Sequence, residues 1–404
     1  MINPSAHGWI DKFFLEQNTA PETVSKNSDL YYKNIRETGF IYGHIIFFNT
    51  QNPIAIDNWL DDEVSKVALL NCLFGMYKLT CDESNSEKFI NKTIAFYNEM
   101  NPQGFSLFKN ILKSSSASLN LEKIINERVQ TNDTIIGKNF SNIVTNALLF
   151  VDVLAFQHYL IEGIIPEKYL KKIEETIINI VTIALKTKAN KSQHDDLLIK
   201  LFEASIRYSK FSKINTQTQN FGIEALELNY FLNDLEKKYL IDIAGLALWS
   251  DGIIENNEAY FLHSLASMMT VSEEFVEESI TATNKFITNY KNEIPYFNYS
   301  NPVKHFYDQT TQVVLTLMNR NKKRLVKEIS ESKELMILLA RSTQRDLDKT
   351  EKKKVKKQLL DICKSIPSLT IFLIPGGSLL LPILIKFIPQ LLPSSFNENL
   401  ENEE

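Results

Sequence analysis

The side chains best suited to chemistry in this sequence form a lysine cluster near its C-terminus. Five lysines fall within six residues: Lys352, Lys353, Lys354, Lys356 and Lys357. Ammonium groups packed this closely attract polyanions, either the phosphates of RNA or of a ribosome or an anionic lipid surface. A plain solvated helix face is the third interpretation. The cluster therefore predicts polyanion binding without naming the partner.

A second group of candidate ligands is acidic and lies in the middle of the chain. Asp251, Glu255 and Glu258 are close along one turn, and hard carboxylate oxygens suit Ca²⁺ or Mg²⁺. Their spacing lacks the alternating ligands of an EF-hand loop. We therefore favour the simpler interpretation, in which Asp251 shapes a turn and the glutamates lie at a solvated helix N-terminus.

We find no residues in the sequence that form a known catalytic motif. The six histidines are scattered, and the sequence contains no HExxH pair, no nucleophile elbow and no phosphate-cradling glycine loop. The three cysteines form neither a CxxC pair nor a disulfide framework, so we expect them to be reduced. The sequence predicts a non-enzymatic protein that needs no cofactor.

The elements that must position these residues are helices. Only 12 Gly and 12 Pro occur in 404 residues, and seven of those 24 lie between Pro367 and Pro393. The rest of the chain is therefore poor in helix breakers. Apolar residues recur at helical spacing from Asp61 to about Lys210. We predict an all-α, multi-helical fold, with one short strand pair near residues 40–50 as the exception to be tested.

The lysine cluster should lie on a capped helix. Asp348 and Glu351 have the spacing of a capping box, and Pro367 should end the helix. The apolar residues between these points recur at i, i+4, i+7 and i+8 and define one narrow face: Val355, Leu359, Ile362 and Cys363.

An apolar stretch follows this helix. No charged side chain occurs from Ser365 to Ile385, a run of 21 residues that could cross a bilayer as a helix. It is interrupted by Pro367, Pro375, Gly376, Gly377, Pro382, Pro389 and Pro393. We expect two short helices, about 366–374 and 378–392. They could form a broken membrane span, a re-entrant hairpin or a helical pair packed in a protein core.

Two segments resemble known families. Residues 235–285 place Ser250-Asp251-Gly252 between one helix and the next, with Ser272 capping a third, and this order resembles the TerB-like family of small helical domains. Metal sensing has been proposed for that family. Residues 350–396 resemble the core of the LETM (leucine-zipper–EF-hand-containing transmembrane) family. The matching phrases are Gln358-Leu359-Leu360, Lys386-Phe387-Ile388-Pro389 and Leu392-Pro393-Ser394-Ser395-Phe396.

The LETM resemblance implies membrane association. It also implies ribosome binding and cation/proton exchange, which are activities of that family. The EF-hands and coiled coils of the family have no counterpart in these 404 residues, which weakens both activities as expectations. Lys386 is the one charge inside the apolar region, so it is the candidate for transport; snorkelling to the interface is the alternative. The combined arrangement is similar to bacterial LETM-related proteins described as biofilm-associated.

These observations divide the chain and rank three hypotheses. We expect an N-terminal helical domain at 1–220, a TerB-like domain at 225–295, a basic region at 300–364, the LETM-like segment at 365–396 and an acidic tail at 397–404. Residues 320–364 hold 15 basic and 7 acidic side chains, a net +8 in a chain of net −5.

The first hypothesis is a membrane-associated binding or scaffold protein with cytoplasmic domains, since lysines flank the cytoplasmic side of a span. The second is a LETM-like homo-oligomer that transports cations or protons. The third is a cytoplasmic ribosome- or RNA-associated protein that uses the basic 320–357 block. No DNA partner is expected.

Overall fold

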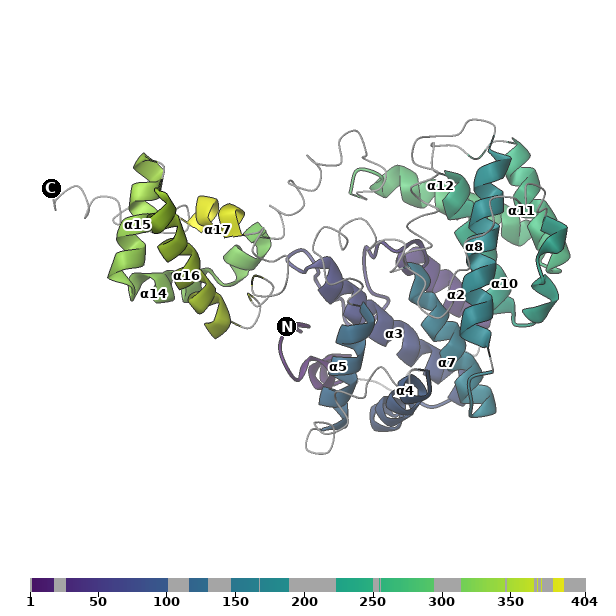
Figure 1. Ribbon diagram of the computed structural model, residues 1–404. Helices are drawn as coiled ribbons and strands as arrows, with labels where there is room; N and C mark the ends of the chain where they lie inside the picture. Colours follow the sequence, from purple (N-terminus) through teal and green to yellow (C-terminus); the bar gives the residue numbers. More distant parts are fainter. Residues whose placement is uncertain are drawn as a thin grey trace. The chain divides into compact units, whose positions relative to one another are not determined.

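The computed structural model describes residues 2–17, 27–100, 116–129, 147–166, 168–188, 223–249, 254, 256–293, 314–345, 347–366, 369, 372 and 381–388. Every regular element in these ranges is a helix, which confirms the all-α prediction for them. The chain separates into two compact units, drawn in Figure 1. The first contains residues 1–55, 64–131 and 140–298, and the second contains residues 56–63, 132–139 and 299–404.

The first unit is a multi-helical assembly. Its helices are α1 (Trp9–Gln17), α2 (Ser28–Glu37), most of α3 (Asp61–Cys81), α4 (Ser86–Met100), α5 (Ala117–Val129), α7 (Phe150–Glu162), α8 (Tyr169–Thr187), α10 (Asp234–Leu248), α11 (Asn256–Met268) and α12 (Glu273–Tyr290), with 3₁₀ turns η1 (Phe40–Tyr42), η3 (Ile223–Ala225) and η4 (Leu228–Tyr230).

The strand pair expected near residues 40–50 is absent from this described segment. The 3₁₀ turn η1 lies there instead, between Gly39 and Gly43, whose φ angles are 84° and 75°. These left-handed conformations suit glycine. They allow the tight turn at residues 39–43, and the residues that follow, 44–50, form no strand.

Helix α10 lies at the centre of one half of the first unit. It packs against α8, α11 and α12, and it buries the apolar face expected from the sequence: Leu240, Ile243, Ala244, Ala247 and Leu248. Asp242 is also wholly buried on this helix. Its carboxylate accepts hydrogen bonds from Tyr32 Oη at 2.7 Å and from the Ser279 hydroxyl. These bonds satisfy a polar group that would otherwise destabilise the core.

A second buried polar network joins α4, α5 and α7. Arg128 donates through Nε to Oδ2 of Asp152 at 2.7 Å, and Tyr97 Oη donates to the same oxygen at 3.0 Å. Both partners of this ion pair are nearly inaccessible to solvent. Because removing one partner would leave an uncompensated buried charge, the network holds these three helices in one arrangement.

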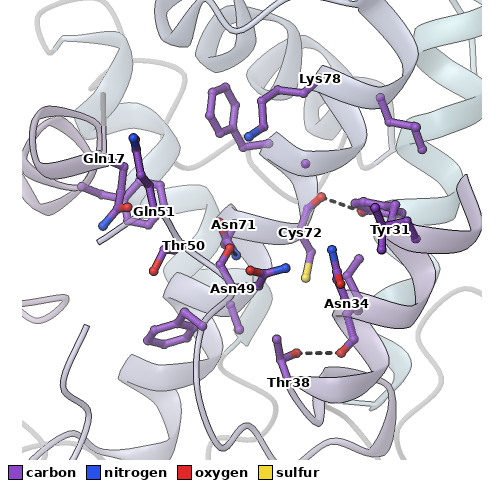
Figure 2. Close-up of a pocket in the computed structure, with 18 of the residues that line it drawn as sticks. Gln17, Tyr31, Asn34, Thr38, Asn49, Thr50, Gln51, Asn71, Cys72 and Lys78 are labelled. Atoms are coloured by element: carbon purple, nitrogen blue, oxygen red, sulfur yellow. Dashed lines mark hydrogen bonds between the residues drawn. The ribbon is translucent and has the colours of Figure 1, made fainter. Parts of the chain in front are cut away.

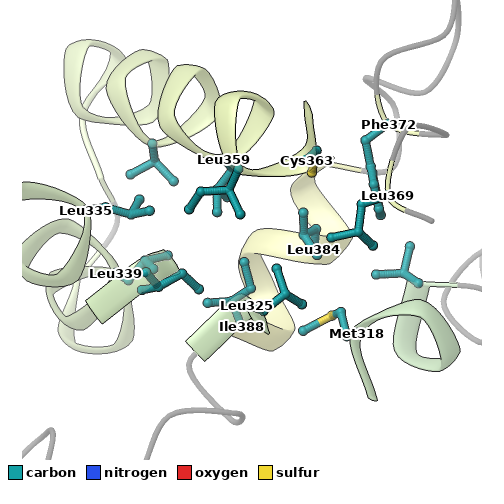
Figure 3. Close-up of a cluster of buried hydrophobic side chains, with 14 of the residues drawn as sticks. Met318, Leu325, Leu335, Leu339, Leu359, Cys363, Leu369, Phe372, Leu384 and Ile388 are labelled. Carbon is teal, nitrogen blue, oxygen red and sulfur yellow. The ribbon is translucent and has the colours of Figure 1, made fainter. Parts of the chain in front are cut away.

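The second unit is smaller and contains the lysine cluster. Residues 314–320 are helical, and they are followed by α14 (Lys322–Ser330), α15 (Lys333–Gln344), α16 (Lys349–Ser365) and α17 (Leu381–Phe387). Helices α14, α15 and α16 contact one another. Figure 3 shows the apolar core between them, to which α17 contributes Leu384 and the following residue Ile388.

The apolar stretch is therefore represented by a short helix and three further core residues. Helix α17 has seven residues, and no helix in the described ranges combines the length and apolarity that crossing a bilayer requires. Of the two helices expected at 366–374 and 378–392, α17 corresponds to part of the second. Within the first, the structure describes Ile366, Leu369 and Phe372, and all three are buried in the same core.

Candidate functional site

The helix that carries the lysines begins with a reciprocal cap. Asp348 accepts hydrogen bonds from the backbone N–H groups of Thr350 at 2.7 Å and Glu351 at 2.8 Å. Glu351 returns a bond, since its carboxylate accepts from the backbone N–H of Asp348 at 3.0 Å. The capping box predicted from the sequence is confirmed. It fixes the first residue of α16 and hence the register of every lysine after it.

The same glutamate also ties α16 to the end of α15. Arg345 donates to both Glu351 carboxylate oxygens, at 2.8 and 2.7 Å, a two-pronged geometry that is the strongest form of this ion pair. The Arg345 hydrogen bonds, followed by the bond from Asp348, lower the pKa of Glu351 to about 2. Glu351 is thus ionised at neutral pH and orients the junction between the two helices.

One face of α16 is buried and the opposite face is basic. Val355, Leu359, Ile362 and Cys363 enter the core, as their spacing predicted. Five lysines predicted as polyanion ligands are all exposed: Lys352, Lys353, Lys354, Lys356 and Lys357. Lys349 and Lys364 are exposed at the two ends of the same helix. Burial of a narrow apolar face leaves the remaining positions to solvent, so the packing itself displays the lysines.

Acidic neighbours partly neutralise this surface. Lys354 donates to Glu334 of α15 at 2.7 Å, and Lys364 donates to Asp361 at 2.7 Å. Lys357 also helps to lower the pKa of Asp361, after the larger contribution of Lys364. In the part of the chain that the structure describes, the other four lysines of the cluster form no ion pair: Lys352, Lys353, Lys356 and Lys357. We call Lys353, Lys356 and Lys357 the outer lysines of α16.

Helix α14 adds a second basic segment to the same unit. Lys322, Lys323, Arg324 and Lys327 are exposed on it, while Leu325 and Ile329 enter the core. Arg320, just before this helix, forms an ion pair instead of remaining exposed. It donates to both carboxylate oxygens of the buried Glu63, at 2.8 and 2.6 Å. The basic 320–357 block predicted from the sequence therefore includes residues with different roles.

The structure describes only some of the residues predicted to form the membrane segment. Lys386 is exposed on α17, with its ammonium 5.5 Å from the centre of the Phe387 ring. Pro382 lies in the first turn of α17, where a proline is tolerated because the backbone N–H has no helical partner there. Pro367, Pro375, Gly376, Gly377, Pro389 and Pro393 lie outside the described residues.

The acidic metal candidates are largely beyond what the structure describes. Asp251 and Glu255 lie outside the described residues. Glu258 lies near the start of α11 and is buried, at 2% exposure, so its placement at a solvated helix N-terminus was wrong for this residue. Among the described residues, no group of three histidine, cysteine or carboxylate side chains could hold a metal ion. The three-carboxylate site remains a prediction.

Comparison with known proteins supports one part of the sequence interpretation. A family model described as "LETM1-like, RBD" matches residues 347–404. The match spans α16 and α17 and hence the lysine cluster and the apolar segment. No curated protein and no solved structure matches the chain. The C-terminal part is thus LETM1-like, while the TerB-like resemblance of residues 225–295 and the biofilm association gain no support.

Proposed function

We propose that this chain is a non-enzymatic binding protein whose second unit docks on ribosomal RNA through the exposed lysines of α16. The observation that carries the proposal is the exposure of all five clustered lysines within the segment that matches a LETM1-like ribosome-binding domain (RBD) model. The apolar side chains described in the same segment are buried in the core of the unit. They support the lysine surface, and the lysines remain available to phosphates.

The strength of such binding follows from the number of phosphates contacted. Each lysine–phosphate contact changes the slope of log affinity against log salt by about −0.7 to −0.9. Five contacts would therefore weaken binding roughly 100- to 500-fold between 50 and 200 mM salt. The ion pairs of Lys354 and Lys364 compete with phosphate, so the outer lysines should dominate.

The proposal is tested by co-sedimentation with ribosomes at a series of salt concentrations. The variant combines Lys353→Gln, Lys356→Gln and Lys357→Gln. It should lower the salt slope by about 2 to 3 units, which is the loss of three contacts. The matched control combines Lys12→Gln, Lys92→Gln and Lys285→Gln, three exposed lysines of the first unit. It removes the same charge and should leave the slope unchanged.

A response to total charge alone would contradict the proposal. If the control weakened co-sedimentation as much as the α16 variant, α16 would not be the docking surface. If the intact chain did not sediment with ribosomes at 50 mM salt, ribosomal RNA would not be its partner.

An anionic membrane surface is the second candidate, and the juxtaposition of two features favours it. The lysine cluster lies directly before the 21-residue stretch without charge, and each lysine near an anionic leaflet contributes about 1 kcal/mol. Flotation with phosphatidylserine and with phosphatidylcholine vesicles separates the two candidates. Flotation with neither vesicle, together with release from membranes by carbonate, would exclude both membrane association and transport. Proteoliposome flux compared between the intact chain and Lys386→Ala tests transport directly.

A further inference from the structure

A pocket in the first unit has a lining that the sequence did not single out. It encloses about 340 Å³ between α1, helix α2, helix α3 and the loop residues 48–51. This size lies within the range of small-ligand sites. Figure 2 shows its polar side chains, with Asn34 of α2 on one side of the Cys72 thiol and Asn49 and Asn71 on the other.

Carboxamides dominate the polar lining. Asn34, Asn49 and Gln51 line the pocket, and their side-chain amides make no hydrogen bond with the residues that the structure describes. Asn71 donates through Nδ2 to the Asn49 carbonyl at 3.3 Å, which leaves its side-chain oxygen as an acceptor. Each carboxamide offers an N–H donor beside a C=O acceptor. No carboxylate occurs among the described lining residues, so the pocket does not select for cations.

The contacts of Cys72 and Tyr31 favour binding over reaction. Burial raises the pKa of the Cys72 thiol, which therefore stays protonated and is a weak nucleophile. The Tyr31 hydroxyl donates to the Cys72 carbonyl at 2.8 Å. Gly75 leaves space for the Tyr31 ring, since an added Cβ would lie 2.8 Å from it. These contacts hold α2 against α3 and give the pocket a preformed wall.

We propose that this pocket binds the main chain of an extended peptide through its carboxamide side chains. A peptide unit presents one N–H and one C=O side by side, which is the complement of an asparagine side chain. The facing positions of Asn34 and Asn71 allow amides on two walls to engage successive units, which repeat about every 3.4 Å in an extended chain. Leu30, Ile35 and Leu79 also line the pocket and would accept small aliphatic side chains.

The test uses a neutral peptide, acetyl-Ala-Leu-Ala-amide, with the intact chain labelled with ¹⁵N at asparagine. Millimolar peptide should shift the side-chain amide signals of Asn34 and Asn71. An analogue in which one peptide N–H is replaced by an ester oxygen should bind at least tenfold more weakly, because a carboxamide oxygen loses its donor. Asn71→Leu should weaken binding by a similar factor, and Asn91→Leu, an exposed asparagine on α4, should not.

Each alternative outcome overturns the proposal. Equal binding of the peptide and its ester analogue would show that the main-chain N–H is not recognised. Absence of shifts at 20 mM peptide, or shifts caused by glucose but not by peptide, would assign the pocket to another ligand or to none. If Asn71→Leu perturbs folding, the ester analogue with the unmodified chain decides the question.

Discussion

Truncation of Leu384 to alanine tests whether the apolar C-terminal segment packs against protein. Leu384 has no solvent-exposed surface, and it lies among core residues of α14, α15 and α16. Leu384→Ala removes three carbon atoms, worth about 2.4 kcal/mol at ~0.8 kcal/mol per buried carbon group. The cavity left behind raises the expected loss of stability to about 2.7–5 kcal/mol. This is a large fraction of the stability of a small unit.

The measurement must report on the second unit alone, because a chain with two units need not unfold in one step. Hydrogen exchange followed by mass spectrometry on peptides from α14 and α16 provides this local measure. A loss of 2.7–5 kcal/mol in the free energy of opening should accelerate their exchange about 90- to 4,000-fold. Peptides from α10, in the first unit, serve as the internal reference.

The matched control is Lys386→Ala, on the same short helix. Lys386 is exposed, so its truncation should change stability by no more than about 0.5 kcal/mol. The reasoning would be refuted if Leu384→Ala left the exchange of α14 and α16 unchanged in the absence of lipid. That result would mean that α17 does not belong to this core, and it would support the interpretation that the segment lies in a membrane.

Three further predictions concern single contacts. Glu351→Gln should destabilise the second unit at pH 7 but not near pH 2, because the depressed pKa of Glu351 contributes stability above about 4.5 that is lost as pH falls toward about 2; acid titrations of both proteins check this. Burial tends to lower the pKa of His158, but its hydrogen bond to Glu236 at 2.7 Å and the charges of Glu236 and Glu162 raise it overall. The stability that this raised pKa contributes is therefore fully present below about pH 6.5 and is lost as the pH rises further. His158→Gln should therefore narrow the stability difference between pH 6 and pH 9 in thermal melts. Gly39→Ala should destabilise the first unit severely or prevent folding, since the new Cβ would clash with the backbone oxygen of His44 and the φ of 84° is strained for alanine. A variant that melts like the parent would contradict this.

Element types and several boundaries were predictable from local patterns. Caps act within four residues, and for this reason Asp348 and Ser272 marked the starts of α16 and α12 correctly. Helix α7 ends at Glu162, before Pro166, because Gly163 adopts a left-handed conformation, with φ 78°, and terminates the helix first. Glycine was the stronger stop signal here, and the proline follows it.

Helical periodicity and capping are local properties, so the amino-acid sequence alone specifies which face of α16 is apolar and therefore which lysines reach solvent. The contacts of the apolar segment depend on the three-dimensional fold: Leu369, Phe372 and Leu384 enter a core built by helices that precede them in the chain. The fold also creates the carboxamide pocket, whose walls come from α1, α2, α3 and the loop residues 48–51. Hydrophobic burial is non-directional, so an apolar sequence specifies that it must leave water, and the arrangement of distant residues specifies where it goes.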